Sequence, residues 1–396
     1  MSIIQDINFK SKKVLIRVDF NVPLDKEFKV ADDTRIRAAK PTILKVSEGG
    51  GSCILMSHLG RPTFNDPQFS LAHIVNSVQD VLCVKVLFSS DCVGEKAGQM
   101  ASELQPGQVL LLENLRYHKE ETLGDLKFAE KLSALADIYI NDAFGTAHRA
   151  HASTTVVAQF FPSAKCFGLL LAKEIECINK VMISGEKPVL AILGGAKVSS
   201  KITIIENILD KIDHLIIGGG MSFTFVKALG GQIGDSICED DKQALALEIL
   251  KIAAEKNVKV HLPVDVLAAD DFSNSANTQT VDIDAIPKHW QGLDCGPKSK
   301  AIFQKVVQDS QTILWNGPLG VFEMEAFSTG TIALGNAIAE ATKNGAFSLV
   351  GGGDSVAAAK QFGFDSKVSY VSTGGGAMLE SLEGKKLPGI AAMQKN

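Results

Sequence analysis

Cysteine pairs of the kind that bind metals are missing from this sequence. The chain has seven cysteines, but they are scattered and include no Cys-x-x-Cys pair. Metal-site and disulfide-framework spacings are therefore both absent. Most of the cysteines lie in apolar runs such as "SCILMS" at 52–57, where a buried free thiol is expected. This usage favours a reducing, cytoplasmic environment.

Long apolar runs and an excess of positive charge are missing as well. Hydrophobic residues make up 45% of the chain, yet no apolar run approaches the roughly 18 residues of a membrane helix, which predicts a soluble globular protein. The first residues, "MSIIQDINFK", show no signal or transit pattern, so we expect no targeting segment. The net charge of -5 argues against a nucleic-acid-binding protein. A length of 396 residues favours two domains or three.

Neither of the familiar nucleotide-binding loops is present. The spacing G-x-x-x-x-G-K-[ST] does not occur, and no G-x-G-x-x-G follows a strand-like run. Residues 193–201 nevertheless read "LGGAKVSSK", with two glycines after an apolar run and two lysines after the glycines. Lys197 and Lys201 would share one face of a helix if that helix begins near Lys197.

Arginine is absent from the chain beyond residue 149. The six arginines are Arg17, Arg35, Arg37, Arg61, Arg116 and Arg149. The rigid guanidinium fork suits bidentate contacts with carboxylates and phosphates, whereas lysine offers a flexible point charge. A solvated surface or a lysine-biased composition could also explain the distribution. Four of the six lie in strings that contain Gly or His, however, so we expect the first half of the chain to bind a small anion.

Short apolar runs alternate with helical patterns along the chain, which predicts parallel sheets covered on both faces. Strands are expected in the first half at 13–20, 52–57, 84–88, 108–114 and 137–144. Strands are expected in the second half at 188–193, 214–218, 259–266, 312–316, 346–351 and 367–373. Helices are expected after Ser70 and from Asp125, two residues that suit an N-cap. A helical pattern at 169–184 belongs to neither series, so we predict two doubly wound α/β domains joined by that helix.

The second series of strands repeats one sequence feature. Four of its strands end in glycines that open a helix: "LGGAK", "IIGGGMS", "LVGGGDS" and "VSTGGGAM". One such loop would indicate only a tight turn. Four at the carboxyl ends of strands in one sheet predict a crevice lined by backbone N–H groups and helix N-termini, which suits a polyphosphate.

The first series places polar residues at its strand ends, in "VDFNVP", "SHLGRP", "ENLRYH" and "NDAFGTAHRAHAS". These side chains should converge on the carboxyl edge of the first sheet. His148 and His151 in "HRAH" could form a metal pair, but no third ligand type clusters with them. Capping or core hydrogen bonds suit these two histidines better.

Taken in order, ten strings resemble the signature segments of the phosphoglycerate kinase family. They are "RVDFNVP", "SHLGRP", "ENLRYH", "NDAFGTAHRAHAS", "AILGGAKVSSK", "GGGM", "LDCGP", "WNGPLGVFE", "VGGGDS" and "STGGGA", and they run from residue 17 to residue 377. The resemblance implies two Rossmann-like domains: an N-terminal one at 1–168 that binds 3-phosphoglycerate and a C-terminal one at 185–379 that binds Mg-ADP or Mg-ATP. It also implies an interdomain helix at 169–184 and a tail at 380–396 that packs back on the N-terminal domain.

The resemblance assigns site residues position by position. It implies a 3-phosphoglycerate site made of Asp19, Asn21, Arg35, His58, Leu59, Gly60, Arg61, Arg116 and Arg149, with Arg17 and Arg37 as nearby basic residues. It implies a nucleotide site made of Gly195, Ala196, Lys201, Gly219, Gly220, Gly292, Asn316, Pro318, Glu323, Gly352, Gly353, Asp354 and Ser355. Asp354 would contact Mg²⁺, and Glu323 the ribose. The family usually has Thr where Ser355 stands, and the segment "TFNDPQFS" at 63–70 is shorter and poorer in lysine than is common.

The implied reaction is reversible phosphoryl transfer between 1,3-bisphosphoglycerate and ADP, without a covalent intermediate, after domain closure. Arg35, Lys197 and the backbone at Gly375 are the expected catalytic groups, although Lys197 could also be a solvated lysine at a helix end. Small molecules are the expected partners, and a monomer the expected state. Two alternatives remain at this stage: a phosphotransferase with a phosphohistidine at His148 or His151, and a non-catalytic nucleotide-binding protein of the same fold.

Overall fold

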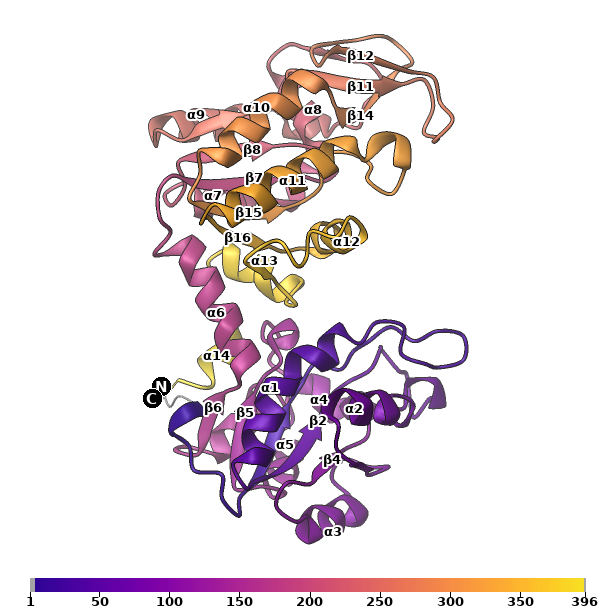
Figure 1. The fold of residues 1–396 in the computed structure, drawn as a ribbon, viewed down its shortest axis with the longest axis vertical. Helices are drawn as coiled ribbons and strands as arrows, with labels where there is room; N and C mark the ends of the chain where they lie inside the picture. The colour runs from indigo at the N-terminus through magenta and orange to yellow at the C-terminus, as the bar shows by residue number, and fades with distance from the viewer. Residues whose placement is uncertain (1–3, 395–396) are drawn as a thin grey trace. The chain divides into compact units, whose positions relative to one another are not determined.

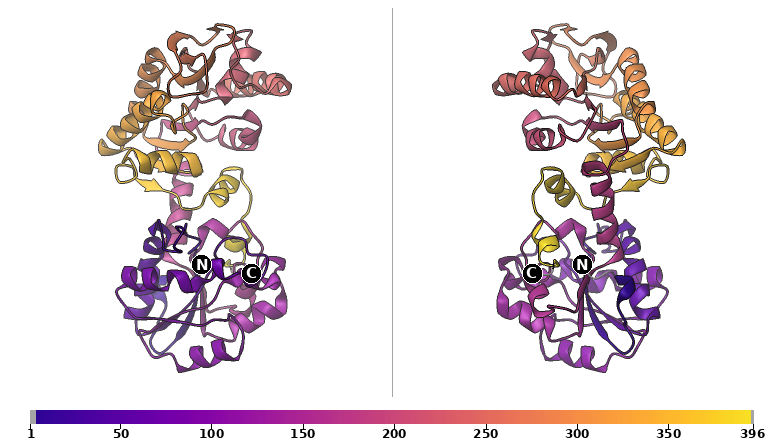
Figure 2. Two further views of the ribbon diagram at one scale, coloured as in Figure 1. Left: turned by 90° about the vertical axis from the view of Figure 1, so that its right-hand side faces the viewer. Right: turned by 90° about the vertical axis from the view of Figure 1, so that its left-hand side faces the viewer.

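Two six-stranded parallel sheets form the centres of this structure, a computed structural model that describes residues 4–394. Each sheet belongs to a compact unit of its own. The first unit contains the chain up to Ile175 together with the segment from Lys386 onward, and the second contains Glu176–Lys385. The ribbon views show helices on both faces of each sheet, as expected for parallel sheets (Figure 1, Figure 2).

The first sheet has the strand order β3-β4-β2-β1-β5-β6. Its strands are β1 (Lys13–Arg17), β2 (Ser52–Met56), β3 (Val86–Phe88), β4 (Val109–Leu111), β5 (Ile138–Asn141) and β6 (Lys165–Phe167). Five of these were predicted, and β6 was not. From β1 the chain adds β2, β3 and β4 on one side, with β4 between β2 and β3, and then crosses to β5 on the other side, so the order reverses between β1 and β5. Ligands of open α/β sheets bind outside the carboxyl ends of the strands at such a point.

Two helical segments of the first unit begin at the N-caps that the sequence predicts. The helices of this unit are α1 (Thr34–Glu48), α2 (Val75–Leu82), α3 (Glu95–Glu103), α4 (Lys119–Leu123), α5 (Leu126–Ser133) and the short α14 (Pro388–Ala391). Ser70 caps a 3-10 turn that leads into α2, and Asp125 caps α5 by accepting a hydrogen bond from the Phe128 N–H. Both predicted caps are confirmed. The expected helix at 169–184 is α6 (Leu169–Met182).

The second sheet has the order β10-β8-β7-β15-β16-β17. Its strands are β7 (Val189–Leu193), β8 (His214–Ile217), β10 (Lys259–His261), β15 (Thr312–Asn316), β16 (Phe347–Val350) and β17 (Tyr370–Val371). The order reverses between β7 and β15. The four glycine-ended strands of the prediction all belong to this sheet and run parallel, so their glycine loops share one edge.

Seven helices lie wholly in the second unit, and the first two and the last two of them follow these glycine loops. They are α7 (Ile202–Ile208), α8 (Met221–Ala228), α9 (Gln243–Glu255), α10 (Pro297–Gln308), α11 (Thr329–Lys343), α12 (Gly353–Gln361) and α13 (Gly376–Leu382). Side chains of α10 and α11, such as Phe303 and Ile338, pack with the fully buried Trp315 of β15 in one apolar core.

Two small sheets in the second unit were not predicted. Strands β11 (Asp265–Ala269), β12 (Thr278–Asp282) and β14 (Gln291–Cys295) form an antiparallel sheet, and β9 (Gln232–Ile233) pairs with β13 (Ala285–Ile286). The single strand predicted at 259–266 is wrong. Pro263 interrupts it, because proline cannot donate to a central ladder, and the run divides into β10 and β11 of different sheets.

The C-terminal segment from Lys386 belongs to the first unit. The Gly389 N–H donates to the Ala147 carbonyl over 2.9 Å, and Lys165 Nζ donates to the Ala392 carbonyl over 2.8 Å. Residues just before it belong to the second unit, where Asn207 Nδ2 donates to the Leu382 carbonyl. No helix within residues 4–394 is long and apolar enough to cross a membrane.

Candidate active site

The loop after β1 and helix α1 form the first part of the site in the first unit. Asp19 follows β1 and accepts a hydrogen bond from Arg35 of α1, with 2.9 Å between Arg35 Nη1 and Asp19 Oδ2. Asn21 Oδ1 accepts a 2.8 Å hydrogen bond from the Gly60 N–H, which joins this loop to the one after β2. The structure therefore brings Asp19, Asn21, Arg35 and Gly60 together at the carboxyl edge, as the sequence predicts.

The segment His58–Arg61 after β2 is held by polar groups from the loop after β4. Asn114 Oδ1 accepts from the Leu59 N–H, and Arg116 Nη1 donates to the Gly60 carbonyl over 2.7 Å. Gly60 has a φ of +60°, and a Cβ there would lie 2.3 Å from the Phe69 ring, so only glycine fits. The Arg61 side chain extends outward and is exposed.

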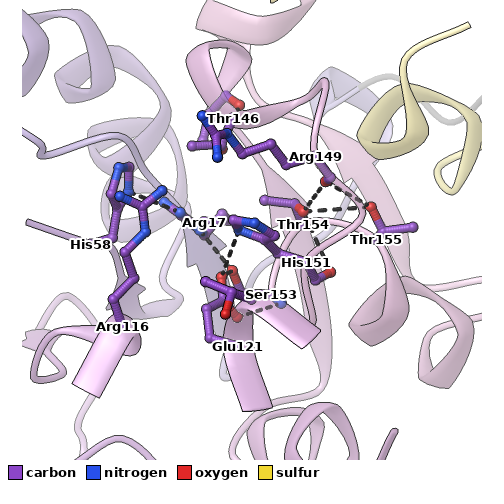
Figure 3. A network of polar contacts seen from close by, with 12 residues as sticks. Arg17, His58, Arg116, Glu121, Thr146, Arg149, His151, Ser153, Thr154 and Thr155 are labelled. Carbon is purple, nitrogen blue, oxygen red and sulfur yellow. Dashed lines mark hydrogen bonds and ion pairs between the residues drawn. The ribbon is translucent and has the colours of Figure 1, made fainter. Parts of the chain in front are cut away.

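Several guanidinium groups lie close enough to affect one another. Burial, followed by the charges of Arg17 and Arg149, lowers the pKa of Arg116 to about 10. Arg149 is exposed, and its Nε donates to His148 Nε2. Figure 3 shows His58, Arg116 and Arg149 around the buried Arg17. Because like charges raise one another's energy, this cluster favours an anion as its ligand.

The second unit contains a cavity of about 400 Å³ at the edge where the glycine loops lie. The predicted residues that line it are Gly195, Ala196, Gly219, Gly220, Gly292, Pro318, Glu323 and Asp354. Its other walls are largely apolar. Gly219 has a φ of +64°, and a Cβ there would lie 2.8 Å from the Gly195 nitrogen, so glycine lets the loops after β7 and β8 approach each other.

Other predicted nucleotide residues lie beside the cavity and do not line it. Lys201 Nζ donates to Asn316 Oδ1, and Asn316 Nδ2 donates to the Gly351 carbonyl over 2.7 Å. The Gly317 N–H donates to Ser355 Oγ, so this hydroxyl serves a backbone contact that a threonine could also make. Burial lowers the pKa of Lys201, and the nearby charge of Asp354 opposes that effect. Gly352 and Gly353 begin α12 next to Asp354.

The two lysines of "LGGAKVSSK" do not lie on one continuous α-helix. A 3-10 turn occupies Val198–Ser200, and Lys201 is the N-cap of α7, which begins at Ile202. Lys197 is extended and exposed just before the 3-10 turn. Helix α7 does not begin near Lys197, so the expectation that Lys197 and Lys201 share one face of a helix is wrong. Gly375, with a φ of 48°, is the N-cap of α13, and a Cβ there would meet nothing within 4 Å.

Some residues of these sites were missed by the sequence reasoning. The apolar walls of the cavity include Phe223, Ile237, Phe272, Leu293 and Val321, which come from separate elements and share no motif. Beneath the arginine cluster, Glu121 and Ser153 are fully buried and hydrogen-bonded to each other. Glu121 lies in the charged run "HKEET", where a solvated side chain would be expected, so nothing in the sequence signalled its burial.

A metal pair at His148 and His151 finds no support. Within residues 4–394 no group of three His, Cys, Asp or Glu side chains could hold a metal ion. Asp354 is an exposed carboxylate that lines the cavity. Mg²⁺ is commonly bound by one or two carboxylates together with substrate phosphates, so Asp354 fits an ion that arrives with a nucleotide.

Comparison with known proteins gives one consistent result. The family model described as phosphoglycerate kinase matches residues 4–385. Phosphoglycerate kinases of Porphyromonas gingivalis and Prosthecochloris aestuarii are 54% and 50% identical, and the alignments cover 99% and 98% of each chain. The solved structure of phosphoglycerate kinase from Coxiella burnetii is 43% identical, with a TM-score of 0.90 over 98% of this chain and 97% of that one. The one from Pyrococcus horikoshii is 31% identical, with a TM-score of 0.84 over 100% and 99%. The chain belongs to the phosphoglycerate kinase family.

Proposed function

We propose that each unit binds one reactant: the first 3-phosphoglycerate or 1,3-bisphosphoglycerate, and the second ADP or ATP with Mg²⁺. The observation that carries this proposal is the pairing of an arginine cluster at one switch point with a glycine-lined cavity at the other. The cluster suits a small organic phosphate, and the cavity suits a nucleotide base and its phosphates. As a member of its family the chain is a kinase of glycolysis that uses a nucleotide together with a metal ion.

The roles of the site residues follow from their chemistry. Arg35, Arg61, Arg116 and Arg149 supply charged donors to the triose phosphate, and Asp19 and Asn21 supply acceptors and orientation. Lys201 binds the nucleotide phosphates, and Glu323 accepts hydrogen bonds from the ribose hydroxyls. Asp354 would hold the Mg²⁺, which when bound neutralises charge on the nucleotide phosphates.

The chemical step needs positioning and charge neutralisation, and no covalent enzyme intermediate. An oxygen of the ADP β-phosphate attacks the phosphorus of the acyl phosphate, and the bond from that phosphorus to the carboxyl oxygen breaks. The products are ATP and a carboxylate. Lys197 and Arg35 stabilise the negative charge spread over the group in transfer, helped by the backbone N–H groups near Gly375. Because the reactants are bound by different units, transfer requires the units to close and exclude water.

A coupled assay tests the proposal directly. ATP formation from ADP and 1,3-bisphosphoglycerate with Mg²⁺ is expected, and no turnover would overturn the proposal. Incubation with [γ-³²P]ATP alone tests the phosphohistidine alternative. Because no observation favours that alternative, we expect no label on the protein. We also propose a monomer in the cytoplasm, since each site uses residues of one unit and none of the seven cysteines forms a disulfide.

A further inference from the structure

Arg17 is a fully buried arginine at the end of β1, beneath the triose phosphate site. Its Nε donates to Ser153 Oγ over 2.8 Å, its Nη1 donates to the Val18 carbonyl, and its Nη2 lies 3.1 Å from His58 Nδ1. Figure 3 shows the guanidinium between His58 and Ser153. A side chain buried this completely and bonded at each nitrogen cannot turn toward a ligand, so its role must be exerted through its neighbours.

The direction of the contact with His58 is fixed by chemistry. A guanidinium has five N–H donors and no acceptor, so His58 Nδ1 must accept the hydrogen bond from Arg17. The proton of a neutral His58 then has to be on Nε2. Among the described residues, the contact with Arg17 is the only hydrogen bond of the His58 ring, which leaves the Nε2–H for an oxygen of a ligand.

A buried carboxylate holds the other side of Arg17. Ser153 Oγ donates to Glu121 Oε1 over 2.6 Å, and the Ser153 N–H donates to Glu121 Oε2 over 2.9 Å. Glu121 has no exposed surface. Since a buried guanidinium without a carboxylate nearby is strongly destabilising, Glu121 with Ser153 accounts for how Arg17 is kept in place. The hydrogen bonds therefore run in fixed directions from Arg17 to His58 on one side and through Ser153 to Glu121 on the other.

The charges around His58 also favour its neutral form. Burial lowers the pKa of His58 well below its usual value, and the charges of Arg17, Arg116 and Arg35 and the nearby His151 act in the same direction. A neutral ring with its proton on Nδ1 would present a lone pair to an anionic ligand and repel it. A neutral ring with its proton on Nε2 presents a donor instead.

We propose that Arg17 is a positioning residue that fixes His58 as the Nε2–H tautomer, and that His58 thereby donates a hydrogen bond to the bound triose phosphate. Glu121 and Ser153 hold Arg17 in the orientation that this requires. The proposal rests on the proposed function for its ligand, but the tautomer itself is a property of the free protein.

The tautomer can be measured without any substrate. Long-range ¹H–¹⁵N correlation spectra of histidine-labelled protein at pH 7, assigned with His58→Gln, should show the His58 proton on Nε2. In Arg17→Met, both tautomers should appear and His58 should titrate at a higher pH. Arg37→Met is the matched control, because Arg37 pairs with Asp33 on the outside of α1 and should leave the His58 signals unchanged. A wild-type proton on Nδ1, or an unchanged spectrum in folded Arg17→Met, would overturn the proposal.

Kinetics then test the consequence for binding. In Arg17→Met the KM for 3-phosphoglycerate should rise about 3- to 10-fold, the scale of one lost hydrogen bond, while the KM for ATP stays unchanged. Equal rises in both would indicate a general structural defect and contradict the positioning role. If Arg17→Met does not fold, the wild-type spectrum still decides the tautomer, and Ser153→Ala should lower the fraction with the proton on Nε2. If the wild-type chain showed no kinase activity, the proposed function would be overturned, and the spectrum would still decide the tautomer of His58 independently.

Discussion

At the level of single residues, the two lysines of "LGGAKVSSK" are held very differently. Lys201 is half-buried and hydrogen-bonded to Asn316, whereas Lys197 is exposed before the 3-10 turn. A side chain that is already fixed by the protein should contact the nucleotide equally in the ground state and in the transition state. A side chain in solvent can be drawn in by the charge that develops during the reaction. The two lysines should therefore contribute to different kinetic constants.

Lys197→Ala should lower kcat and kcat/KM together and leave KM nearly unchanged. An interaction made mainly in the transition state has this signature, and loss of one such charge typically costs about 3–4 kcal/mol, roughly a hundred- to thousandfold in rate. Steady-state kinetics with both substrates would measure it. A kcat within a few fold of wild type would exclude Lys197 from the mechanism.

Lys201→Ala should weaken nucleotide binding as well as slow turnover. The substitution removes a charge from the proposed phosphate-binding site and leaves the fully buried Asn316 without its donor. Calorimetric titration with ADP should show a loss of about tenfold or more. Lys187→Ala is the control, because Lys187 pairs with Asp213 before β7, at the amino end of the strand, and should leave ADP affinity unchanged.

Much of the candidate site in the first unit could be predicted from the sequence, but the buried residues that support it could not. Asp19, His58 and Arg116 follow apolar runs, and the carboxyl ends of parallel strands meet at one edge, so their convergence could be predicted. Arg35 lies in α1 and was placed in the site only by the family resemblance. The burial of Arg17 and Glu121 could not, because charged residues are buried only where a partner from elsewhere in the chain meets them. Arg17 and Glu121 are joined through Ser153, which is far from both in sequence.

At the level of elements, strands were predicted where apolar runs were long, and missed where the strand is short or carries polar residues, as in β6 and β14. The strand β12 reads "TQTVD" and alternates exposed with half-buried residues, so it carries no apolar run. The expected strand at 367–373 shrinks to the two residues of β17 at the sheet edge. The start of α7 was misplaced because the glycine loop continues into a 3-10 turn before regular helix begins.

Two adjacent strands of the second sheet carry histidines that face each other. His214 of β8 and His261 of β10 stack with ring centroids 5.2 Å apart and share a 3.0 Å hydrogen bond. One ring nitrogen must accept that bond, so both rings cannot be charged while it persists. Burial, followed by the charges of His214 and Lys259, lowers the pKa of His261 to about 4.

The histidine pair should make the second unit less stable in acid. The unfolded chain binds a proton near pH 6.5, whereas folded His261 does so only near pH 4, so the free energy of unfolding falls as pH falls between these values. Urea unfolding should show a lower free energy of unfolding at pH 5 than at pH 7. In His261→Gln this loss should be smaller than in wild type by about 1 kcal/mol, a figure discounted for partial exposure. His289→Gln, at a side chain 90% exposed, should retain the wild-type loss. An identical loss in His261→Gln would contradict this account.

At the level of the whole molecule, each proposed ligand depends on one unit. The arginines belong to the first unit and the glycine-lined cavity to the second. The absence of arginine beyond residue 149 agrees with the proposed division, because bidentate anion contacts would then be needed in one half of the chain only. The apolar walls of the cavity could not be anticipated, since they come from separate elements that only the fold brings together.

Substitutions in the two units should therefore affect different ligands. Arg149→Ala removes an exposed guanidinium from the arginine cluster and should weaken 3-phosphoglycerate binding about 10- to 100-fold, the scale of a charged hydrogen bond, without changing ADP affinity. Glu323→Gln alters the cavity wall and should weaken ADP binding several-fold without changing 3-phosphoglycerate affinity. Calorimetry with each ligand alone on both variants gives the four affinities. Since each ligand is titrated in the absence of the other, closure of the units around both reactants cannot mix the two effects. Loss of ADP binding in Arg149→Ala, with 3-phosphoglycerate binding intact, would show that the ligands have been assigned to the wrong units.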